Sequence, residues 1–276
     1  MAIKAQDVKK LREATGVGMM DCKKALVEAD GDFEQAVEIL RKKGQKVAAK
    51  RADRDASEGA IVTATTASGD AGVIVEVNSE TDFVARNSDF VDFAQSIADA
   101  ILAARPADLD AAKRSADVNG QPLGEALVQM TGKIGEKIDV RRFEIVDGAG
   151  GTVVDYIHPG AKLGVLAVMT GDGDLAEAGR DVAMQAAAMN PVAATRDDVP
   201  QEVQDKEREI GREQARAEGK PEQILDKIAE GKLTRYFKDN VLVEQPFVKD
   251  SSMTVQQMLD KSSAGLTRFV RFALGG

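Results

Sequence analysis

Two stretches of this chain are versions of each other, so its fold must contain the same unit twice. Residues 59–77 (GAIVTATTASGDAGVIVEV) lie above residues 151–169 (GTVVDYIHPGAKLGVLAVM) without a gap when Gly72 is placed on Gly164, an offset of 92 residues. The identical positions are Gly59, Val62, Gly72 and Val73 with Gly151, Val154, Gly164 and Val165. The apolar matches are Ile61, Ile74 and Val77 with Val153, Leu166 and Met169. Turn residues stand in the middle of each copy, so the repeat predicts two β-hairpins of one design.

The sequence after each hairpin repeats the same succession of elements. An amphipathic helix is expected at 90–102 in the first copy and at 182–189 in the second. The next helix of each copy carries its apolar residues at Leu123, Leu127 and Met130, or at Val255, Met258 and Leu259. Late alternating strands follow at 141–146 and 268–274. Since hairpins with helices on one face give an α+β architecture, we predict two related antiparallel α+β subdomains side by side. Their ranges are 55–147, and 148–197 plus 241–276.

Residues 1–54 show three short apolar stripes at helical spacing. The first stripe is Val8 and Leu11, on a short helix that also carries Arg12. The other two are Met19, Cys22, Ala25, Leu26 and Ala29, and Phe33, Ala36, Val37 and Leu40. Gly16 can end the first helix, and Gly31 fits the left-handed position after the second. Asp32 with Gln35 makes a capping box for the third helix. The three helices resemble a ubiquitin-associated-like bundle, and because so small a core is marginal by itself, we expect a tethered docking module.

A charge-dense segment at 198–240 interrupts the second copy. Its sparse apolar residues are Val203 and Ile210 before a Gly219-Lys220-Pro221 turn, and Ile224, Leu225, Ile228, Leu233 and Phe237 after it. This pattern predicts an antiparallel helical (coiled-coil) hairpin that projects from the core. A narrow seam buries little, so the hairpin is either a self-packed solvated strut or an arm for a partner or for self-association. The sequence leaves both interpretations open.

The charge balance indicates the kind of partner. A formal charge of -9 and a pI near 4.9 argue against wholesale phosphate binding, which depends on clustered Lys and Arg. The exception is the basic stretch 41–54 (RKKGQKVAAKRADR), which has no interleaved aromatic residue. A solvated helix end and linker explains it better than RNA contact, since cations also suit a helix C-terminus. We therefore expect another protein, and not nucleic acid, as the direct partner.

Composition and the N-terminal sequence predict a cytoplasmic protein. With 43% hydrophobic and 30% charged residues the chain should be globular, and 276 residues are enough for two domains of ordinary size. No apolar run approaches the ~20 residues that cross a bilayer, and the N-terminus lacks a hydrophobic signal segment, so no membrane association is expected. The single cysteine, Cys22, suits a reducing compartment.

Residues suited to covalent chemistry are few. One His and one Cys cannot make a zinc site, and a nucleophilic pair would have to join Cys22, on an apolar helix face, to His158 in a distant hairpin. No phosphate-binding glycine loop or dinucleotide fingerprint is present, and the carboxylates are scattered at the spacing of helix surfaces. The sequence therefore gives little support to an enzyme, and it indicates no cofactor.

The first hairpin ends in an unusual turn at 76–86 (EVNSETDFVAR). Phe83 follows acidic and polar residues where a loop would normally become more polar, in a chain with nine Phe, two Tyr and no Trp. At the repeat offset, Asp82 and Phe83 fall on Asp174 and Leu175. One interpretation makes Asp82 a helix cap and Phe83 a core residue. The other makes Phe83 a protruding aromatic that inserts into another molecule.

Two long motifs give the chain a family resemblance. Residues 11–26 (LREATGVGMMDCKKAL) and 76–86 resemble the two characteristic motifs of the bacterial elongation factor Ts family, in the expected order and separation. The likeness continues at 156–166 (YIHPGAKLGVL), 219–221 (GKP) and 245–248 (QPFV), so it covers essentially the whole chain. It implies a guanine-nucleotide exchange factor for the GTPase elongation factor Tu, which removes GDP so that GTP can load. Such a factor needs no covalent chemistry and no cofactor of its own.

The resemblance also implies which residues meet the GTPase. The segment implicated in dislocating the bound Mg²⁺ ion is Thr81, Asp82, Phe83 and Val84. The other residues expected at the partner are Arg12, Met19, Met20, Lys23 and His158. Two alternatives stay open: the methionines as filler of a small core, and the histidine as a hydrogen-bonding turn residue. A homodimer in a 2:2 complex is an assembly that the resemblance allows.

The chain departs from the family pattern at two places. Some members continue past the last strand with a helical extension that contacts the partner, whereas this sequence ends at Gly276, so that contact is expected to be absent. Ala161 stands where the family hairpins often carry another Gly. Two other classes of function stay open: a general adaptor that binds unrelated partners through residues 1–54, and an enzyme with an unrecognised carboxylate site.

Overall fold

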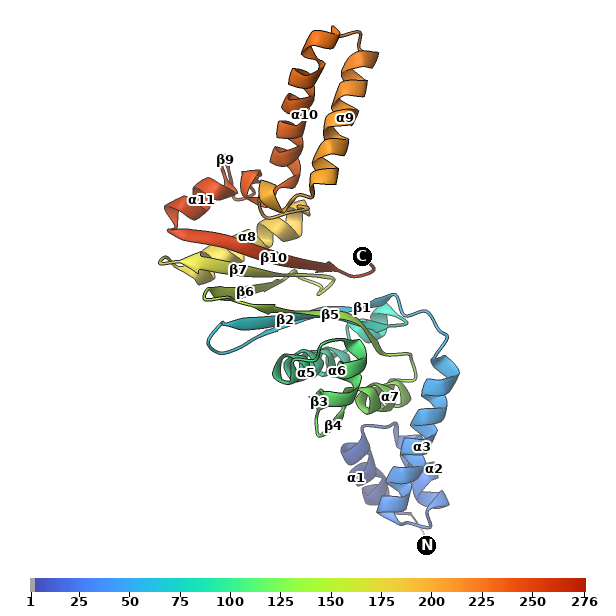
Figure 1. Ribbon diagram of the computed structural model, residues 1–276. Coiled ribbons are helices and arrows are strands. Elements are labelled where there is room, and N and C mark those ends of the chain that lie inside the picture. The colour runs from blue at the N-terminus through green and yellow to red at the C-terminus, as the bar shows by residue number, and fades with distance from the viewer. Residues whose placement is uncertain (1–2) are drawn as a thin grey trace.

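The longer strands form two three-stranded antiparallel sheets with the same strand order. The computed structural model describes residues 3–276 (Figure 1). The first sheet has the order β1-β2-β5, and the second, read the same way, has the order β6-β7-β10. The strands are β1 (Glu58–Thr65), β2 (Ala71–Ser79), β5 (Asp139–Asp147), β6 (Thr152–Ile157), β7 (Leu163–Gly171) and β10 (Ala264–Ala273). Both predicted hairpins and both late strands are confirmed, and the chain is of the α+β class.

The two sheets also share their register. Ala60 lies opposite Val77 in the first hairpin, and at the repeat offset Thr152 lies opposite Met169 in the second. The third strand of each sheet also shifts its pairing register by one residue, as in a β-bulge. The shift lies beside an arginine at the matching position, Arg142 in β5 and Arg268 in β10. Ladders that match this closely confirm the repeat that the sequence indicates.

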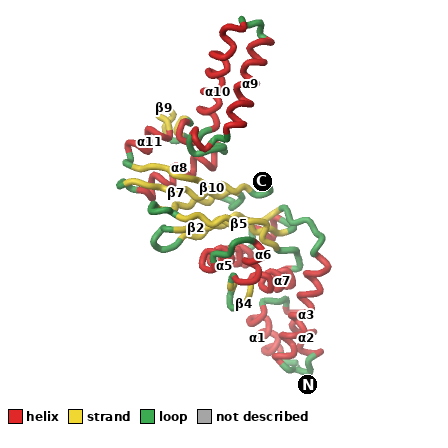
Figure 2. The backbone as a smooth tube through the Cα atoms, viewed as in Figure 1, coloured by secondary structure: helices red, strands yellow, loops and turns green. Residues whose placement is uncertain are grey.

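The two sheets pack face to face, with helices on their outer faces (Figures 1 and 2). The cluster between them consists of Ile61, Ile74, Val146, Val153, Leu166, Val168, Val270 and Phe272. The covering helices are α5 (Ser88–Ala104), α6 (Leu109–Ser115) and α7 (Leu123–Ile134) on the first sheet, and α8 (Leu175–Met189) and α11 (Val255–Lys261) on the second. The subdomains are therefore stacked, and the prediction that they lie side by side is wrong. The physical reason is that β2 is buried along its whole length, so its sheet needs a cover on both faces.

Matching backbone hydrogen bonds join the two hairpins. Ile61 N donates to Ala161 O at 2.6 Å, and Val153 N donates to Gly69 O at 2.7 Å. At the repeat offset Ile61 corresponds to Val153, and Gly69 corresponds to Ala161. The same bond is thus made twice in opposite directions, so an approximate two-fold axis relates the hairpins.

The N-terminal residues form the three predicted helices, which are α1 (Ala5–Thr15), α2 (Met19–Glu28) and α3 (Phe33–Arg51). Their common core consists of Val8, Leu11, Cys22, Ala25, Leu26, Ala29, Ala36 and Leu40. Gly16 and Gly31 take the expected left-handed conformation, with φ of 65° and 89°. The capping box is only half formed. Asp32 accepts from Gln35 N at 2.9 Å, but Asp32 N donates to Ala29 O and not to the Gln35 side chain.

α3 is longer than its apolar stripe indicates, and it reaches the first subdomain. It continues through the basic stretch to Arg51, so the linker predicted at 41–54 is confined to the residues after the helix. Its second half packs on α7, where a Cβ added to Gly132 would lie 2.4 Å from Gly44 Cα. Because glycine offers no side chain to mark a contact, the apolar pattern stopped at Leu40 although the helix did not.

The predicted helical hairpin projects from the core (Figure 1). Its helices are α9 (Gln201–Ala217) and α10 (Leu225–Asn240). Gly211 lets the helices approach closely, since a Cβ there would lie 3.0 Å from Ala229 Cα. Ile224 does not join the predicted seam, because it lies in a 3₁₀ turn before α10 and is exposed.

Short elements complete the fold. They are α4 (Asp82–Ala85), β3 (Asp117–Val118), β4 (Gln121–Pro122), β8 (Pro246–Phe247), β9 (Asp250–Thr254) and 3₁₀ turns at Arg196–Asp198, Glu222–Ile224 and Leu242–Glu244. Within residues 3–276, no helix combines the length and the apolarity needed to cross a bilayer. Nor does this part of the chain bring together three or more side chains that could hold a metal ion.

Candidate partner-binding site

Phe83 lies on the surface of the first subdomain. Its side chain is 85% exposed, on the single-turn helix α4 between β2 and α5. The interpretation of Phe83 as a core residue is therefore wrong, whereas the next residue, Val84, packs on the subdomain core. A ring that is not buried within its own chain is available to another molecule. We call residues 79–86 the Phe83 turn.

Thr81, and not Asp82, is the N-cap of α4. Thr81 Oγ1 accepts from Val84 N at 3.4 Å, and Asp82 is the first residue of the helix. The Asp82 carboxylate pairs with Arg86 at 3.0 Å. In the second copy Asp174 does cap its helix, α8, by accepting from two backbone N–H groups. The caps of the two copies thus lie one residue apart at the repeat offset, and the capping role predicted for Asp82 is wrong.

Glu136 holds Thr81 from the loop after α7. Thr81 N donates to Glu136 Oε2 at 3.0 Å, and Thr81 Oγ1 donates to the two carboxylate oxygens at 2.9 and 3.1 Å. Both residues are half-buried, so these charge-assisted bonds are partly shielded from water. The carboxylate therefore fixes the residue at which α4 begins.

Glu80 ties the same turn to two further elements. Its carboxylate accepts from Lys137 N at 2.6 Å and pairs with Arg51 Nη1, at the end of α3, at 2.7 Å. Desolvation raises the pKa of Glu80, but the Lys137 hydrogen bond and the Arg51 guanidinium outweigh it and hold this pKa below its ordinary value. The helix that crosses from the N-terminal bundle thus ends in an ion pair with the Phe83 turn.

The residues of the first motif surround the connection between α1 and α2. Arg12 and Lys23 are exposed, and Met19 and Met20 are 46% and 63% exposed. The interpretation of these methionines as core filler is therefore wrong. Flexible thioether side chains adapt to the surface that covers them, which suits a contact with a partner.

A lysine joins this connection to the start of α5, the helix that follows the Phe83 turn. Lys133, in the last turn of α7, lies against Gly16, where an added Cβ would meet Lys133 Cε at 2.6 Å. Its ammonium pairs with Asp89 at 2.8 Å, at the start of α5 and just after the Phe83 turn. The hydrogen bond and charge of Lys133 lower the pKa of the Asp89 carboxyl. One side chain therefore contacts the first motif at Gly16 and the helix that follows the Phe83 turn at Asp89.

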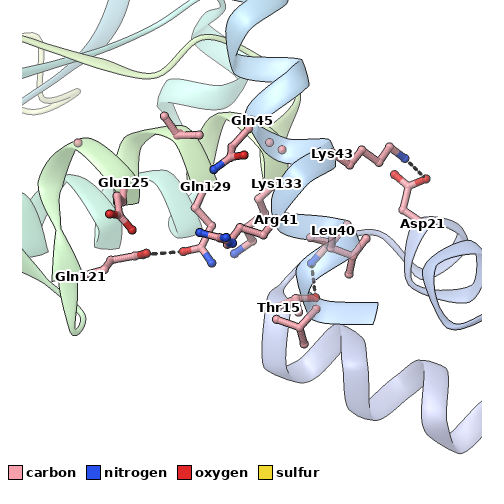
Figure 3. A pocket seen from close by; sticks show the side chains of 16 residues that line it. Thr15, Asp21, Leu40, Arg41, Lys43, Gln45, Gln121, Glu125, Gln129 and Lys133 are labelled. Atoms are coloured by element: carbon pink, nitrogen blue, oxygen red, sulfur yellow. Dashed lines mark hydrogen bonds and ion pairs between the residues drawn. The ribbon is translucent and has the colours of Figure 1, made fainter. Parts of the chain in front are cut away.

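A cavity of about 230 Å³ lies beside this link, between α3, α7 and the α1–α2 connection (Figure 3). Its apolar walls are Val17, Val37, Leu40 and Val128. Three of its basic residues are paired: Lys43 lies 2.6 Å from Asp21, as Figure 3 shows, Arg41 pairs with Glu38, and Lys133 pairs with Asp89. The cavity is thus a space left beside the glycine crossing, and its basic residues already have acidic partners.

His158 lies exposed at the tip of the second hairpin. Its Nδ1 is 3.0 Å from Tyr156 Oη, which agrees with its interpretation as a hydrogen-bonding turn residue. Lys162 of the same tip pairs with Glu58 at 2.9 Å, and Glu58 lies opposite Ser79 in the ladder of the first hairpin. The tip that carries His158 therefore lies beside the start of the Phe83 turn.

The two nucleophile candidates stay apart. Cys22 is buried in the core of the N-terminal bundle, where its thiol donates to Val17 O at 3.4 Å. His158 is on the surface of another subdomain. Cys22 and His158 therefore lie in different parts of the fold.

Sequence reasoning missed the residues that hold the Phe83 turn. Glu136 is 55 residues from Thr81 along the chain, and Arg51 is 29 residues from Glu80. Neither separation follows the period of a helix or a strand, and no motif signals the contacts. Only the packing of α3 and α7 beside the turn brings these side chains together.

Comparison with known proteins gives a single family. A family model described as "Elongation factor TS" matches residues 80–276. The chain is 46% identical over 284 residues to the elongation factor Ts of Prosthecochloris aestuarii, with 99% of each chain covered. It is 48% identical over 279 residues to that of Amoebophilus asiaticus, with 100% of each covered. It is 49% identical over 276 residues to that of Cytophaga hutchinsonii, with 99% of each covered.

Proposed function

The chain belongs to the elongation factor Ts family of translation elongation factors, and on that premise we propose that it is a guanine-nucleotide exchange factor for elongation factor Tu. It binds the GDP-bound GTPase, dislocates the Mg²⁺ ion and promotes GDP release so that GTP can bind. The observation that supports this proposal most directly is the exposure of Phe83 on a turn held by two carboxylates. The activity requires no covalent chemistry by the chain itself.

The physical basis is differential binding to two states of the GTPase. In a P-loop GTPase, phosphate-cradling backbone and Mg²⁺ hold the nucleotide together. An exchange factor must bind best to the conformation in which that grip is broken, and by linkage the nucleotide then weakens the binding of the factor equally. Burial of the exposed Phe83 ring against the GTPase supplies ~2 kcal/mol toward the broken conformation.

Two sets of residues carry this function. The set that acts near the Mg²⁺ ion is Thr81, Asp82, Phe83 and Val84, in which Phe83 inserts into the partner while its neighbours hold the turn. The set that contacts the GTPase elsewhere is Arg12, Met19, Met20, Lys23 and His158. All five of these side chains are exposed. Lys133 and Lys162 connect their segments to Asp89 and Glu58, which flank the Phe83 turn in α5 and β1.

We also propose four domains and a cellular setting. The domains are a ubiquitin-associated-like bundle at 1–54, a core subdomain at 55–147, a second core subdomain at 148–197 plus 241–276, and a coiled-coil hairpin at 198–240. The protein acts in the cytoplasm without direct contact with nucleic acid or membrane, in keeping with its charge of -9. A homodimer within a 2:2 complex with the GTPase is the assembly that the proposal allows.

Release of fluorescent GDP from purified elongation factor Tu tests the proposal. The intact chain should accelerate release, and Phe83→Ala should slow it about 30-fold, the factor that corresponds to ~2 kcal/mol. Val192→Ala is a matched control, because this side chain is 59% exposed in the loop after α8. No acceleration by the intact chain would exclude the function. An unaltered rate for Phe83→Ala would exclude the role of this ring alone.

A further inference from the structure

The position of Phe83 depends on contacts outside its own helix. α4 has four residues, none of them buried, and one helical turn is too short to be stable by itself. The capping bond from Val84 N to Thr81 Oγ1 is long, at 3.4 Å. Other groups must therefore fix the direction in which the ring leaves the surface.

The Phe83 turn and the loop after α7 supply these contacts, because a carboxylate from each accepts a backbone hydrogen bond from the other. Thr81 N donates to Glu136 at 3.0 Å, and Lys137 N donates to Glu80 at 2.6 Å. Each carboxylate thus accepts from the residue that follows the other carboxylate in the sequence. The exchange ties the Phe83 turn to the loop after α7.

The loop that carries Glu136 is itself fixed. Gly135 ends α7 in the left-handed conformation, with φ of 84°, and donates from its N–H to Thr131 O at 2.8 Å. Ile138 N donates to Thr131 Oγ1 at 3.1 Å, and both of these residues are buried. Glu136 therefore reaches Thr81 from a rigid base, which is what holding another group in place requires.

The second copy of the repeat closes the equivalent turn differently. Gly173 N, the counterpart of Thr81 N, donates to the backbone carbonyl of Ser263 at 3.2 Å. Leu175, the counterpart of Phe83, is half-buried and packs on the core of its subdomain. The reciprocal carboxylate hydrogen bonds are thus found in the first copy, in which the aromatic residue Phe83 is exposed.

We infer that Glu136 is a positioning residue for Phe83. The inference rests on the proposed exchange function, and it assigns to Glu136 a role that is exerted through Thr81. By fixing the start of α4, the carboxylate holds the ring in its exposed position before the partner arrives. Such pre-organisation removes the cost of ordering the turn at the moment of binding. Loss of Glu136 therefore lowers the maximal rate of GDP release more than it weakens docking.

The test measures fluorescent-GDP release from elongation factor Tu over a range of concentrations of the full chain. Glu136→Ala removes both acceptor oxygens and should lower the maximal rate about tenfold, while the half-saturating concentration changes by less than about twofold. Glu136→Gln keeps one acceptor for Thr81 N and should restore most of the rate. The matched control is Glu125→Ala, an exposed glutamate of α7 that makes no hydrogen bond or ion pair within residues 3–276, and it should behave as the wild type.

A double-variant cycle separates positioning from general loss of structure. In a Phe83→Ala background, Glu136→Ala should reduce the rate little further, because the ring that it positions is gone. In the free chain, amide hydrogen exchange at Thr81 should accelerate in Glu136→Ala and stay unchanged in Glu125→Ala. If Glu136→Ala slowed GDP release by the same factor with and without Phe83, the inference would be wrong but the proposed function would not be affected. A wild-type rate of release in Glu136→Ala would have the same consequence. If the intact chain fails to accelerate release, the proposed function falls and the inference falls with it.

Discussion

Thr63 donates a hydrogen bond from Oγ1 to Asp155 Oδ2 at 2.6 Å, and these two residues occupy the same position in the two copies of the repeat, 92 residues apart. A contact between equivalent residues lies close to the axis that relates them. One polypeptide thus contains the geometry of a two-fold dimer interface. Because the apolar cluster between the sheets belongs to both subdomains, we expect them to unfold together.

Two positions related by the approximate two-fold axis carry different residues, so exchanging them tests the cost of a left-handed backbone conformation. Gly69 and Ala161 are equivalent positions with φ of 71° and 52°. A side chain in this conformation costs about 1–2 kcal/mol, while Gly loses about 0.4–1 kcal/mol more conformational entropy on folding. We therefore predict that Gly69→Ala lowers the free energy of unfolding by about 1 kcal/mol, and that Ala161→Gly raises it by about 0.5 kcal/mol. Urea unfolding measures both, and changes of the same sign would contradict the prediction.

The repeat made most of the fold predictable, because hairpin register and strand alternation are local properties of neighbouring residues. The stacking of the sheets was not predictable in the same way. Val73 and Ile74 are both buried, one against helices and the other against the second sheet. Alternation shows that both faces are apolar, but it does not show what covers the second face. The contact of α3 with α7 was missed because Gly44 and Gly132 make it without side chains.

The candidate site was predictable only as a set of residues. The sequence left Phe83 open to two interpretations, and the structure decides between them by exposing the ring. The predicted cap, Asp82, was one residue from the true cap, Thr81, because both residue types cap helices well. The contact of Glu136 with Thr81 depends on tertiary packing over 55 residues, which no local pattern encodes.

Glu76 forms a buried ion pair with Arg142 between the sheets. Replacing Glu76 and replacing Arg142 should lower the free energy of unfolding by different amounts. The Glu76 side chain is fully buried and accepts from Arg142 Nε at 2.8 Å. Arg142 is partly exposed, and its guanidinium lies 4.2 Å from the Phe272 ring centroid. Arg142→Met removes the nearer of two cations from this buried carboxylate and leaves only Arg141, whose Nε is 4.0 Å away, so we predict a loss of about 3 kcal/mol in the free energy of unfolding.

Glu76→Met leaves a cation that water still reaches, so we predict about half that loss or less. Chemical unfolding of the two variants under one set of conditions makes the comparison. If Glu76→Met lowered the free energy of unfolding more than Arg142→Met, the cost of an unpaired buried carboxylate would not be the larger of the two effects.

Replacing the two glycines at the crossing of α3 and α7 should change the free energy of unfolding by different amounts. A Cβ on Gly132 would lie 2.4 Å from Gly44 Cα, whereas a Cβ on Gly44 would lie 3.6 Å from Gly132 Cα, an ordinary contact distance. We predict that Gly132→Ala destabilises the chain by about 1–3 kcal/mol through overpacking. Gly44→Ala should be neutral or stabilise by up to about 1 kcal/mol, because Ala is the better helix former. Calorimetric unfolding checks the pair, and equal losses would contradict the asymmetry.

Glu80 should make the stability of the Phe83 turn depend on pH. Its pKa lies below the ordinary value of 4.5, so around that pH the folded chain binds fewer protons than the unfolded chain. The stabilising contribution is therefore complete above pH 4.5 and is lost as the pH falls through the folded-state pKa. Glu80→Gln, which cannot titrate, should flatten this part of the acid-stability curve. Urea unfolding at a series of acidic pH values measures the slope, and an unchanged slope in Glu80→Gln would contradict the prediction.

Phe83 should matter for exchange and not for the stability of the chain. Since its ring is 85% exposed, Phe83→Ala should change the free energy of unfolding by less than about 0.5 kcal/mol while it slows GDP release. Phe83→Leu introduces the residue found at the equivalent position of the second copy, and its smaller apolar surface should give an intermediate rate. Val84→Ala is the contrast, because this side chain packs on the core and its truncation should lower stability by about 1 kcal/mol or more. Unfolding and GDP release are measured on the same preparations, and if Phe83→Ala lost as much stability as Val84→Ala, its slower exchange would reflect damage to the fold.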